Sequence, residues 1–550
     1  MKRDFMAQVK PILLSIFLLL LGATAMAEPA GDDKGDLVLS AMRAELERSK
    51  SQLKMDQVAA PYYIEYRIYD VDEYSAETSF GALRGDVRGR FRFLRVVVRI
   101  GDYKQDSYFG QGEGSFDFMP VDDDMLALRH QLWQATDRAY KTAAESLTAK
   151  QAQLKQLTID QPVDDFAHAD PVQSIGALVK LEFDPQPWKK MLQDASALYK
   201  NDPDMEAFES SLRFQAVNRY FVNSEGTVVR SGQDQYQMTI TCRTQAADGM
   251  SLARDNGFFV SSMKELPSAA EFISRAEALA KSLKDLRSSP LVEEEYRGPV
   301  LFSADASASV FADLVGENLL GYKPDLGKNA RTTGAFASSY KTRVLPDFLS
   351  VVDDPTIPSY AGNSLLGHYE IDDEGVRAQK VSLIEHGNLV NYDIGRVPIR
   401  DFPTSNGHGR ARVPSNPPGP SLGNLIVTSS QPTSKEDLKK KLLEQCQQRD
   451  LPYCYYVETF GPRLAPRLLY KVWTKDGHQE LVRGAVFGEL DVRALRSSLV
   501  AAGDDVYIDN RPLNIPHSIA APSVLFDELE VKRANLNKEK LPDYPAPAVK

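Results

Sequence analysis

Apolar and charged residues alternate along residues 62–68 and 90–93, and this pattern places the strongest constraint on the fold. Successive side chains of a β-strand point to opposite faces of a sheet, so the alternation predicts strands with one buried face. Residues 75–83 and 96–100 have a similar strand-like composition. We expect these four segments to form an antiparallel meander whose apolar face is covered by another element.

Other stretches have the spacing of apolar residues that is typical of helices. The segment 122–157 is long enough to cover the meander with its apolar side. A capping box, formed by Ser268 and Glu271 directly after Pro267, predicts the start of another helix. The remaining predicted helices span residues 37–54, 305–320 and 434–448.

The 550-residue chain is too long for one hydrophobic core, so we expect several domains. A turn signal at residues 223–226 separates two strands of a second strand block. The predicted fold class is α+β and multi-domain, with antiparallel β-sheets and flanking helices. The expected divisions are a signal peptide over residues 1–27, an N-terminal α+β domain over 28–200, a middle strand block and helix over 201–297, and a C-terminal β-rich domain over 298–550.

The first residues have the pattern of a secretory signal peptide. Lys2, Arg3 and Lys10 precede an apolar run over residues 12–21, and a small-residue cleavage site ends at Ala27. A membrane-spanning helix needs roughly 20 apolar residues, which is about twice the length of this run. We therefore expect export to the periplasm or the medium, with cleavage after Ala27 and no membrane association afterwards.

Charge and cysteine content narrow the possible partners and the compartment. The net charge of -11 argues against nucleic acid as a partner, because phosphate binding needs a surface rich in Lys and Arg. Three cysteines are too few for a disulfide scaffold in a chain of this size. Cys446 and Cys454 flank the end of a predicted helix and can pair in an oxidising compartment, whereas Cys242 lies alone in a strand-like run. The sequence leaves this pairing open.

Several segments of the last three hundred residues resemble the TldD/PmbA family, also described as peptidase family U62 and as modulators of DNA gyrase. Each segment is short, but together they follow one another in family order. They are residues 352–355, 372–376, 382–389, 406–409 and 481–485. The resemblance implies a two-lobed α+β protein that pairs into a dimer around an enclosed cavity. It also implies metallopeptidase ancestry, since active members cleave peptides or partly unfolded small proteins.

The resemblance implies a particular zinc site. In active members the motif His-Glu-x-x-x-His lies on the helix that opens the third domain, and a cysteine thiolate from the C-terminal part is a further ligand. Imidazole and thiolate bind Zn²⁺ well, and the glutamate can act as general base on a metal-bound water. Here Ala312, Asp313 and Glu317 occupy the corresponding positions of the motif. The C-terminal segment 507–516 contains no cysteine. The family's zinc ligands are therefore missing, and no cofactor is predicted.

A replacement site remains a weaker alternative. Asp313 and Glu317 stand four residues apart on one predicted helix and could share a Ca²⁺ or Mg²⁺ ion, although a solvated acidic helix face is the preferred interpretation. A relocated metal site could instead use His386 or His408. The carboxylates that could assist either histidine are Asp353, Asp354, Asp372 and Asp373, and the other histidines near the family segments are His368 and His517.

Two functional hypotheses follow, and no catalytic residue is assigned. The first is a catalytically degenerate protein that binds a peptide or unfolded small protein, or serves as the inactive subunit of a homodimer or of a heterodimer with a TldD/PmbA paralogue. The second is an active peptidase with a relocated metal site. A structural module without a ligand is a third possibility, and it predicts no closed cavity.

Overall fold

A computed structural model describes residues 35–108, 114–159, 162–412, 414–512 and 515–535, together with Tyr544. The predicted signal peptide, residues 1–27, lies outside the described residues. Among the residues that are described, no helix is long and apolar enough to cross a membrane.

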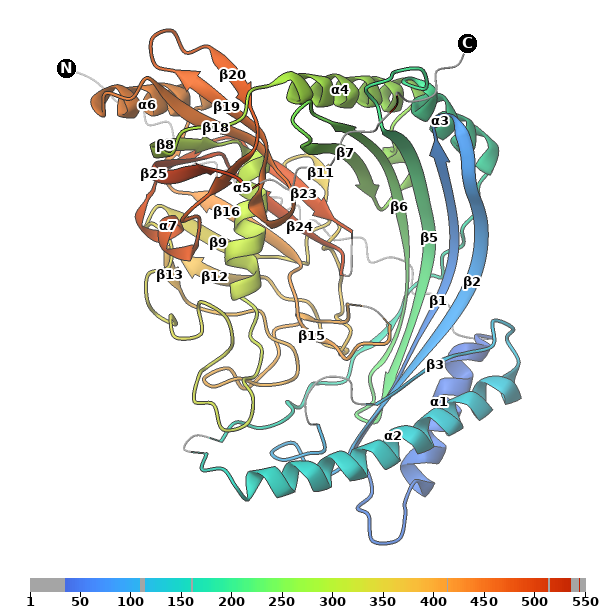
Figure 1. Ribbon diagram of the computed structural model, residues 1–550. Helices are drawn as coiled ribbons and strands as arrows, with labels where there is room; N and C mark the ends of the chain where they lie inside the picture. Colours follow the sequence, from blue (N-terminus) through green and yellow to red (C-terminus); the bar gives the residue numbers. More distant parts are fainter. Residues whose placement is uncertain are drawn as a thin grey trace, which may run out of the picture.

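The N-terminal half forms one long, curved sheet of seven strands (Figure 1). The strand order is β3-β2-β1-β5-β6-β4, and β7 also pairs with β6. All neighbours are antiparallel except β4 and β6. The strands are β1 (Tyr63–Ser79), β2 (Ala82–Arg99), β3 (Ser115–Phe118), β4 (Gln173–Ile175), β5 (Ala207–Asn223), β6 (Val228–Gln245) and β7 (Ser251–Val260).

The predicted meander of four short strands is wrong in detail, because β1 and β2 are two long strands. The segment 75–83, expected to be one strand, instead contains their turn at Phe80 and Gly81, where φ is 47° and 81°. The alternation predicts that the charged residues of 62–68 face solvent, but both faces of this part of β1 are buried, and Arg67 lies on the face that was expected to be exposed. The predicted turn at residues 223–226 is confirmed between β5 and β6.

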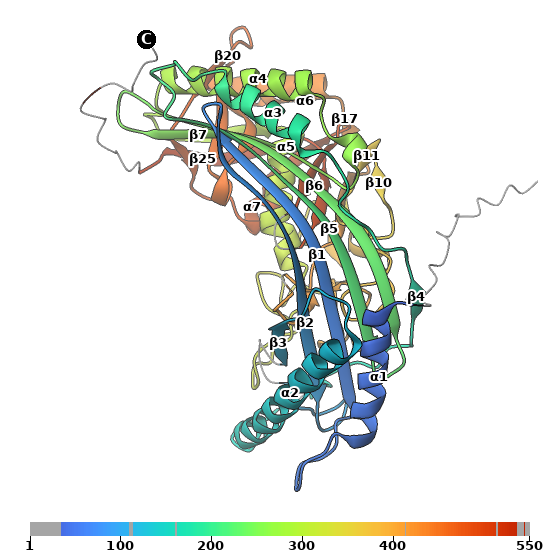
Figure 2. The ribbon, with the colours of Figure 1, turned by 90° about the vertical axis from the view of Figure 1, so that its right-hand side faces the viewer.

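Helices cover the sheet at both ends (Figure 2). At one end α1 (Leu37–Gln52) and α2 (Met125–Leu154) pack on β1, β2 and β5, as predicted for the long second helix. At the other end α3 (Pro185–Ala197) and α4 (Ala269–Ser288) pack on β5, β6 and β7, and the Ser268 side chain caps α4 as predicted. The strands on both sides of the division expected at residue 200 thus belong to one sheet.

The C-terminal half contains two further large sheets and two short strand pairs, so the predicted α+β class is confirmed. A six-stranded sheet has the order β13-β12-β9-β16-β24-β23, and an eight-stranded sheet has the order β17-β22-β25-β8-β18-β19-β20 with β21 on β25. The first consists of β9 (Leu349–Asp353), β12 (Val381–Glu385), β13 (Asn388–Leu389), β16 (Asn424–Ser429), β23 (Tyr507–Arg511) and β24 (His517–Ala521). The second consists of β8 (Tyr296–Phe302), β17 (Pro432–Thr433), β18 (Tyr453–Phe460), β19 (Pro466–Trp473), β20 (Gln479–Val482), β21 (Ala485–Phe487), β22 (Leu499–Gly503) and β25 (Val524–Arg533).

The helix that opens this half differs from the continuous helix expected over residues 305–320. An α-helix, α5 (Ala304–Val310), continues as a π-helical turn (Phe311–Val315) and ends in a 3-10 turn (Gly316–Asn318). The remaining elements are α6 (Lys435–Gln448), α7 (Val492–Ser497) and the short strand pairs β10 (Ser359–Tyr360) with β11 (Asn363–Ser364) and β14 (Gly409–Arg410) with β15 (Gly419–Pro420). The helix predicted over residues 434–448 is therefore confirmed, with Ser434 as its N-cap.

Cys446 in α6 and Cys454 in β18 form a disulfide, whereas Cys242 is a buried free thiol. Leu438, Leu442 and Leu525 surround the pair in a small apolar core between α6 and the eight-stranded sheet. The disulfide closes a short loop and fixes the C-terminal end of α6 against β18.

Candidate functional site

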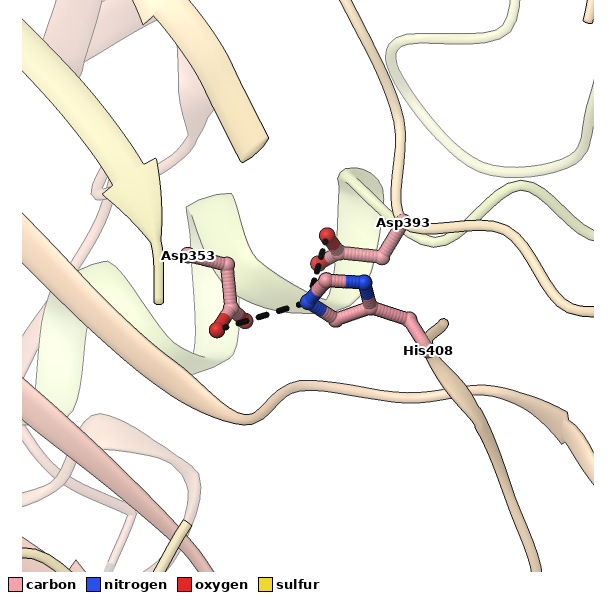
Figure 3. Close-up of side chains that lie close together, drawn as sticks. All are labelled: Asp353, Asp393 and His408. Atoms are coloured by element: carbon pink, nitrogen blue, oxygen red, sulfur yellow. Dashed lines mark ion pairs between the residues drawn. The ribbon is translucent and has the colours of Figure 1, made fainter. Parts of the chain in front are cut away.

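Three buried side chains that can bind a metal converge where the loops of the C-terminal half meet (Figure 3). Asp353 is the last residue of β9, Asp393 lies in the loop after β13, and His408 directly precedes β14. The Nε2 atom of His408 lies 3.6 Å from Asp353 Oδ1 and 3.5 Å from Asp393 Oδ1. All three residues are fully buried, with 0% exposure.

Backbone groups of the next strand hold the Asp353 carboxylate in place. Oδ2 accepts a hydrogen bond from the N–H of Gly423 at 2.8 Å, and Oδ1 accepts one from the N–H of Asn424 at 2.7 Å. A Cβ on Gly423 would lie 2.9 Å from Asp353 Oδ1 and 2.8 Å from the Pro355 side chain. Glycine is therefore required at residue 423 for this close approach.

Asn406 fixes the loop of His408 to the segment that carries Asp393. Its Oδ1 accepts a hydrogen bond from the N–H of Ile394 at 2.8 Å, and its Nδ2 donates to the carbonyl of Tyr392 at 2.8 Å. The Nδ1 atom of His408 lies 3.1 Å from both the carbonyl oxygen and Oδ1 of Asn406. Both oxygens are acceptors, so Nδ1 is the donor and Nε2 points at the two carboxylates.

Part of this cluster has no hydrogen-bonding partner. Within the described part of the chain, neither oxygen of Asp393 nor Nε2 of His408 forms a hydrogen bond, although all three atoms are buried. Burial raises the pKa of Asp393 well above its usual range; His408 opposes the shift and Asp353 adds to it. Burial alone would lower the pKa of His408, but the carboxylates of Asp393 and Asp353 raise it to about 9.

The residues at the family's predicted metal positions form a different arrangement. Ala312 is buried and has no donor atom, while Asp313 lies in the π-helical turn and is 41% exposed. Arg511, at the end of β23, donates from one guanidinium nitrogen to Asp313 at 3.1 Å and from another to Asp509 at 2.7 Å. The two segments that would supply zinc ligands are thus adjacent, but they hold an ion pair.

These residues do not fit a zinc ion. A guanidinium stays positively charged at every relevant pH and would repel a cation placed beside Asp313. Glu317 lies on the following 3-10 turn, exposed to solvent. Of all groups of three or more potential ligands among the described residues, only the cluster of Asp353, Asp393 and His408 brings its donor atoms within 4.8 Å of one another.

The other carboxylates near the family segments have structural roles. Asp373 forms an ion pair with Arg219, which connects the two halves of the chain, and another with Arg410 of its own half. Asp372 accepts hydrogen bonds from the N–H groups of Glu374, Val376 and Gly409. Asp354 bonds to Thr356.

The remaining candidate histidines do not join the cluster. His386 lies in the exposed turn between β12 and β13, with a φ of 45°. His368 Nδ1 lies 2.9 Å from the carbonyl oxygen of Pro355, and His517 Nδ1 lies 2.8 Å from that of Ile515. Among the predicted candidates, the structure therefore brings together only His408 and Asp353.

Sequence reasoning missed Asp393, the third member of the cluster. It stands between Tyr392 and Ile394, both of which are buried in the main C-terminal core. An acidic residue within such an apolar run was the available signal, because a buried carboxylate needs a partner. Its partner could not be identified, because it lies in a separate loop.

A pocket of about 310 Å³ lies between the N-terminal half and the C-terminal half. Its lining includes Lys104 and Lys150 from the first half, and Lys323, Arg331 and Arg400 from the second. Several of these cations already have carboxylate partners, such as Asp165 for Lys150 and Lys323. The lining does not include Asp353, Asp393 or His408, so the pocket does not expose the buried cluster.

Comparisons with known proteins agree with the resemblance seen in the sequence. Residues 295–533 match the family model described as the PmbA/TldA metallopeptidase C-terminal domain. Metalloprotease MJ0996 of Methanocaldococcus jannaschii is 27% identical over 282 residues, which make up 48% of this chain and 54% of that protein. The chain thus spans about half the length of this curated relative.

Three solved structures have a similar fold. A Thermotoga maritima protein named as a modulator of a DNA gyrase matches with a TM-score of 0.59 and 15% identity, over 89% of this chain and 100% of that one. TldE from Thermococcus kodakarensis matches with a TM-score of 0.58 and 13% identity, over 89% and 99%. A Bacteroides thetaiotaomicron protein, also named as a modulator of DNA gyrase, matches with a TM-score of 0.59 and 12% identity, over 92% and 99%. The likeness extends over both halves of the fold.

Proposed function

Because this chain belongs to the TldD/PmbA family, we propose that it is an exported, catalytically degenerate member that binds peptides or unfolded small proteins. The ion pair between Asp313 and Arg511 carries this proposal. It occupies the junction at which the family resemblance places the zinc ligands, and it supplies a permanent positive charge in place of an imidazole or thiolate. Export is supported by the disulfide between Cys446 and Cys454, since such bonds persist in oxidising compartments.

An exposed aromatic surface supports the peptide-binding part of the proposal. Phe91 on β2 and Phe116 and Phe118 on β3 are 44%, 37% and 60% exposed, and Val87 on β2 is 63% exposed. Phe116 and Phe118 have ring centroids 5.9 Å apart. Exposed apolar clusters of this kind often mark interaction sites.

The backbone beside this surface is suited to an extended peptide. β3 pairs with residues 93–96 of β2, and no described strand pairs with the outer edge of residues 82–92. An open strand edge can accept a further strand through main-chain hydrogen bonds, while alternate side chains provide specificity. A peptide added to β2 would lie along Val87 and Phe91.

Membership of the family also supports the proposed role as an inactive partner subunit. A degenerate subunit retains the fold of the family while a paralogue supplies the metal and the reaction. The alternative, an active peptidase with a relocated site, is favoured by the approach of His408 to Asp353 and Asp393. That cluster is fully buried, however, and a hydrolytic metal needs an open position for water and substrate.

The first test measures hydrolysis and binding of the same substrate by the mature chain alone. We expect a fluorescent, carboxymethylated, permanently unfolded protein to bind, and to remain uncleaved whether Zn²⁺ or a chelator is added. The F91S/F118S variant should bind it at least about tenfold more weakly, because both rings lose their apolar contact area. The variant L126S is the matched control, since Leu126 is 78% exposed but lies on α2, outside the aromatic surface.

Two outcomes would contradict the proposal. Chelator-sensitive cleavage that is lost in H408A would establish the alternative, an active relocated site. Equal binding by the wild-type chain, F91S/F118S and L126S would rule out the aromatic surface as the peptide site.

A further inference from the structure

The geometry of Asp353, Asp393 and His408 leads us to propose that they bind a divalent transition-metal cation, with Zn²⁺ as the best fit, as a closed structural centre. This inference is independent of the proposed peptide binding and concerns residues outside the family's zinc motif. The site would take one imidazole nitrogen from His408 and carboxylate oxygens from the two aspartates. Imidazole favours Zn²⁺ and related transition metals over Ca²⁺ and Mg²⁺.

The separations of the donor atoms agree with a tetrahedral ion. Zinc binds nitrogen and oxygen at about 2.0–2.1 Å, so two ligands of a tetrahedral zinc lie about 3.3–3.4 Å apart. His408 Nε2 lies 3.6 Å from Asp353 Oδ1 and 3.5 Å from Asp393 Oδ1. These two separations are close to the tetrahedral values, and all three donor atoms lie within 4.8 Å of one another, so one ion could contact all three after a small movement of the side chains.

The buried atoms that form no hydrogen bond point to a cation rather than to a closed hydrogen-bond network. Both Asp393 oxygens and His408 Nε2 are buried without a hydrogen bond among the described residues. Leaving such atoms unsatisfied is costly, and two neighbouring carboxylates add electrostatic repulsion. A divalent cation with neutral His408 would bring the net charge of the cluster to zero, and the second Asp393 oxygen can serve as a fourth ligand.

The surroundings of the cluster already orient its ligands. Nδ1 of His408 bonds to Asn406, which directs Nε2 toward the ion, and a metal-binding histidine usually makes such a bond. Asp353 is held by the N–H groups of Gly423 and Asn424. A carboxylate oxygen has two lone pairs, so Asp353 Oδ1 can accept the N–H of Asn424 with one and bind a metal with the other.

A metal at this point would join segments that are distant in the sequence. Asp353 ends a central strand of the six-stranded sheet, and the N–H of Asp393 donates to the carbonyl of Leu319 at 3.0 Å, just after the 3-10 turn. His408 belongs to the loop that also contacts Asp372 through Gly409. With no exposed ligand, the ion would stabilise the C-terminal half and would not activate water.

The experiment measures the metal content and the thermal stability of the full mature chain. Protein stripped with a chelator is dialysed against Zn²⁺, and elemental analysis should then find about one zinc per chain, with a higher Tm than the stripped protein. Co²⁺ in the same site should give the intense visible absorption of a tetrahedral complex, whereas Ca²⁺ and Mg²⁺ should leave the Tm unchanged.

Variants locate the bound ion. H408A and D393N should each lose the equivalent of zinc and the rise in Tm, while H386A, which alters an exposed histidine outside the cluster, should keep both. If D393N does not fold, H408A and the cobalt spectrum of the wild-type chain still decide the question. Absence of bound zinc from the wild-type chain, or an unchanged zinc content in H408A, would overturn the proposal. Cleavage of peptides plays no part in this test, so it can fail while the proposed function stands.

Discussion

The R396M variant is expected to unfold with a free energy about 3–5 kcal/mol lower than the wild-type chain, because it leaves a buried carboxylate without its charged partner. Arg396 belongs to the C-terminal half, yet its side chain is fully buried against the N-terminal half. One guanidinium nitrogen donates to Glu225 at 2.7 Å, and Glu225 is 7% exposed in its side chain. Methionine keeps the apolar volume but supplies no donor.

Further contacts of Arg396 would be lost at the same time. Its guanidinium donates twice to the carbonyl of Ala167, at 3.0 Å and 2.7 Å. The same group lies 4.1 Å from the ring centroid of Phe166 and 5.1 Å from that of Tyr63. The side chain thus connects the C-terminal half to the first strand and to the turn between β5 and β6, so its loss should loosen the whole interface.

Urea unfolding followed by tryptophan fluorescence measures the change. The R377M variant is the matched control, since Arg377 is an exposed arginine of the same half, and its midpoint should stay close to that of the wild type. The R396M/E225Q double variant should recover part of the loss, because the carboxylate of residue 225 is then no longer buried without its partner. Equal midpoints for R396M and R377M would show that the buried pair adds nothing to stability.

Local patterns predicted the helices better than the strands. α1, α2, α4 and α6 follow from apolar spacing and from side-chain caps such as Ser268 and Ser434, which act within one turn of the helix. α3 was not predicted, although Asp184 caps it and Pro185 opens it, because its apolar face is short. Local signals of this kind are reliable only where several of them coincide.

Strand lengths were underestimated because the sheet buries charges in pairs. Arg67 forms an ion pair with Glu65, and Arg92 forms one with Asp70, and all four residues are buried. Each pair places charged residues on a buried face, although the alternation predicts that the charged face of the strand is exposed to solvent. Which charged residues are buried depends on the neighbouring strands and on the packing of the C-terminal half against the sheet.

The candidate site was predicted only in part, for a similar reason. The family-like segment 406–409 contains His408, which was a candidate for a relocated metal site, and Asp353 was considered as its carboxylate partner. Asp393 completes the cluster through the fold of a third segment, which no spacing in the sequence reveals. The loss of the family's metal ligands was visible at residues 312 and 317 and in the cysteine-free segment 507–516, while the ion pair of Arg511 with Asp313 required the structure.

The second large predicted effect is a change in the free energy of unfolding with pH, and it arises from Glu374. Burial and the neighbouring Asp372 carboxylate raise the pKa of Glu374 from 4.5 to about 7, although the N–H and the charge of Arg396 oppose the shift. Burial also raises the pKa of Asp372 to about 6, so the two carboxyl groups titrate as a pair. The folded state therefore binds protons more tightly than the unfolded chain.

The sign of the effect follows from this difference. Between pH 5 and pH 8 the unfolded chain holds fewer protons than the folded one, so the free energy of unfolding falls as the pH rises. A shift from 4.5 to about 7 corresponds to roughly 3 kcal/mol for Glu374. Asp373 has a lowered pKa because Arg219, Arg410 and Arg67 outweigh its burial, and it titrates only in stronger acid, outside this window.

The E374Q variant isolates the contribution of this carboxyl group. Glutamine can still accept the hydrogen bond from the N–H of Arg396 but cannot ionise, so E374Q should match the wild type near pH 4, below the unfolded pKa of 4.5, and exceed it by roughly 3 kcal/mol at pH 8. Urea midpoints measured at half-unit pH steps give the two profiles. The control E370Q changes an exposed carboxyl group in the same segment and should keep the wild-type slope. Parallel profiles for E374Q and the wild type would show that Glu374 is ionised without cost in the folded protein. The decline in stability would then have to come from another group with a raised pKa in this range, such as Asp372 or Asp305, whose pKa values are each about 6.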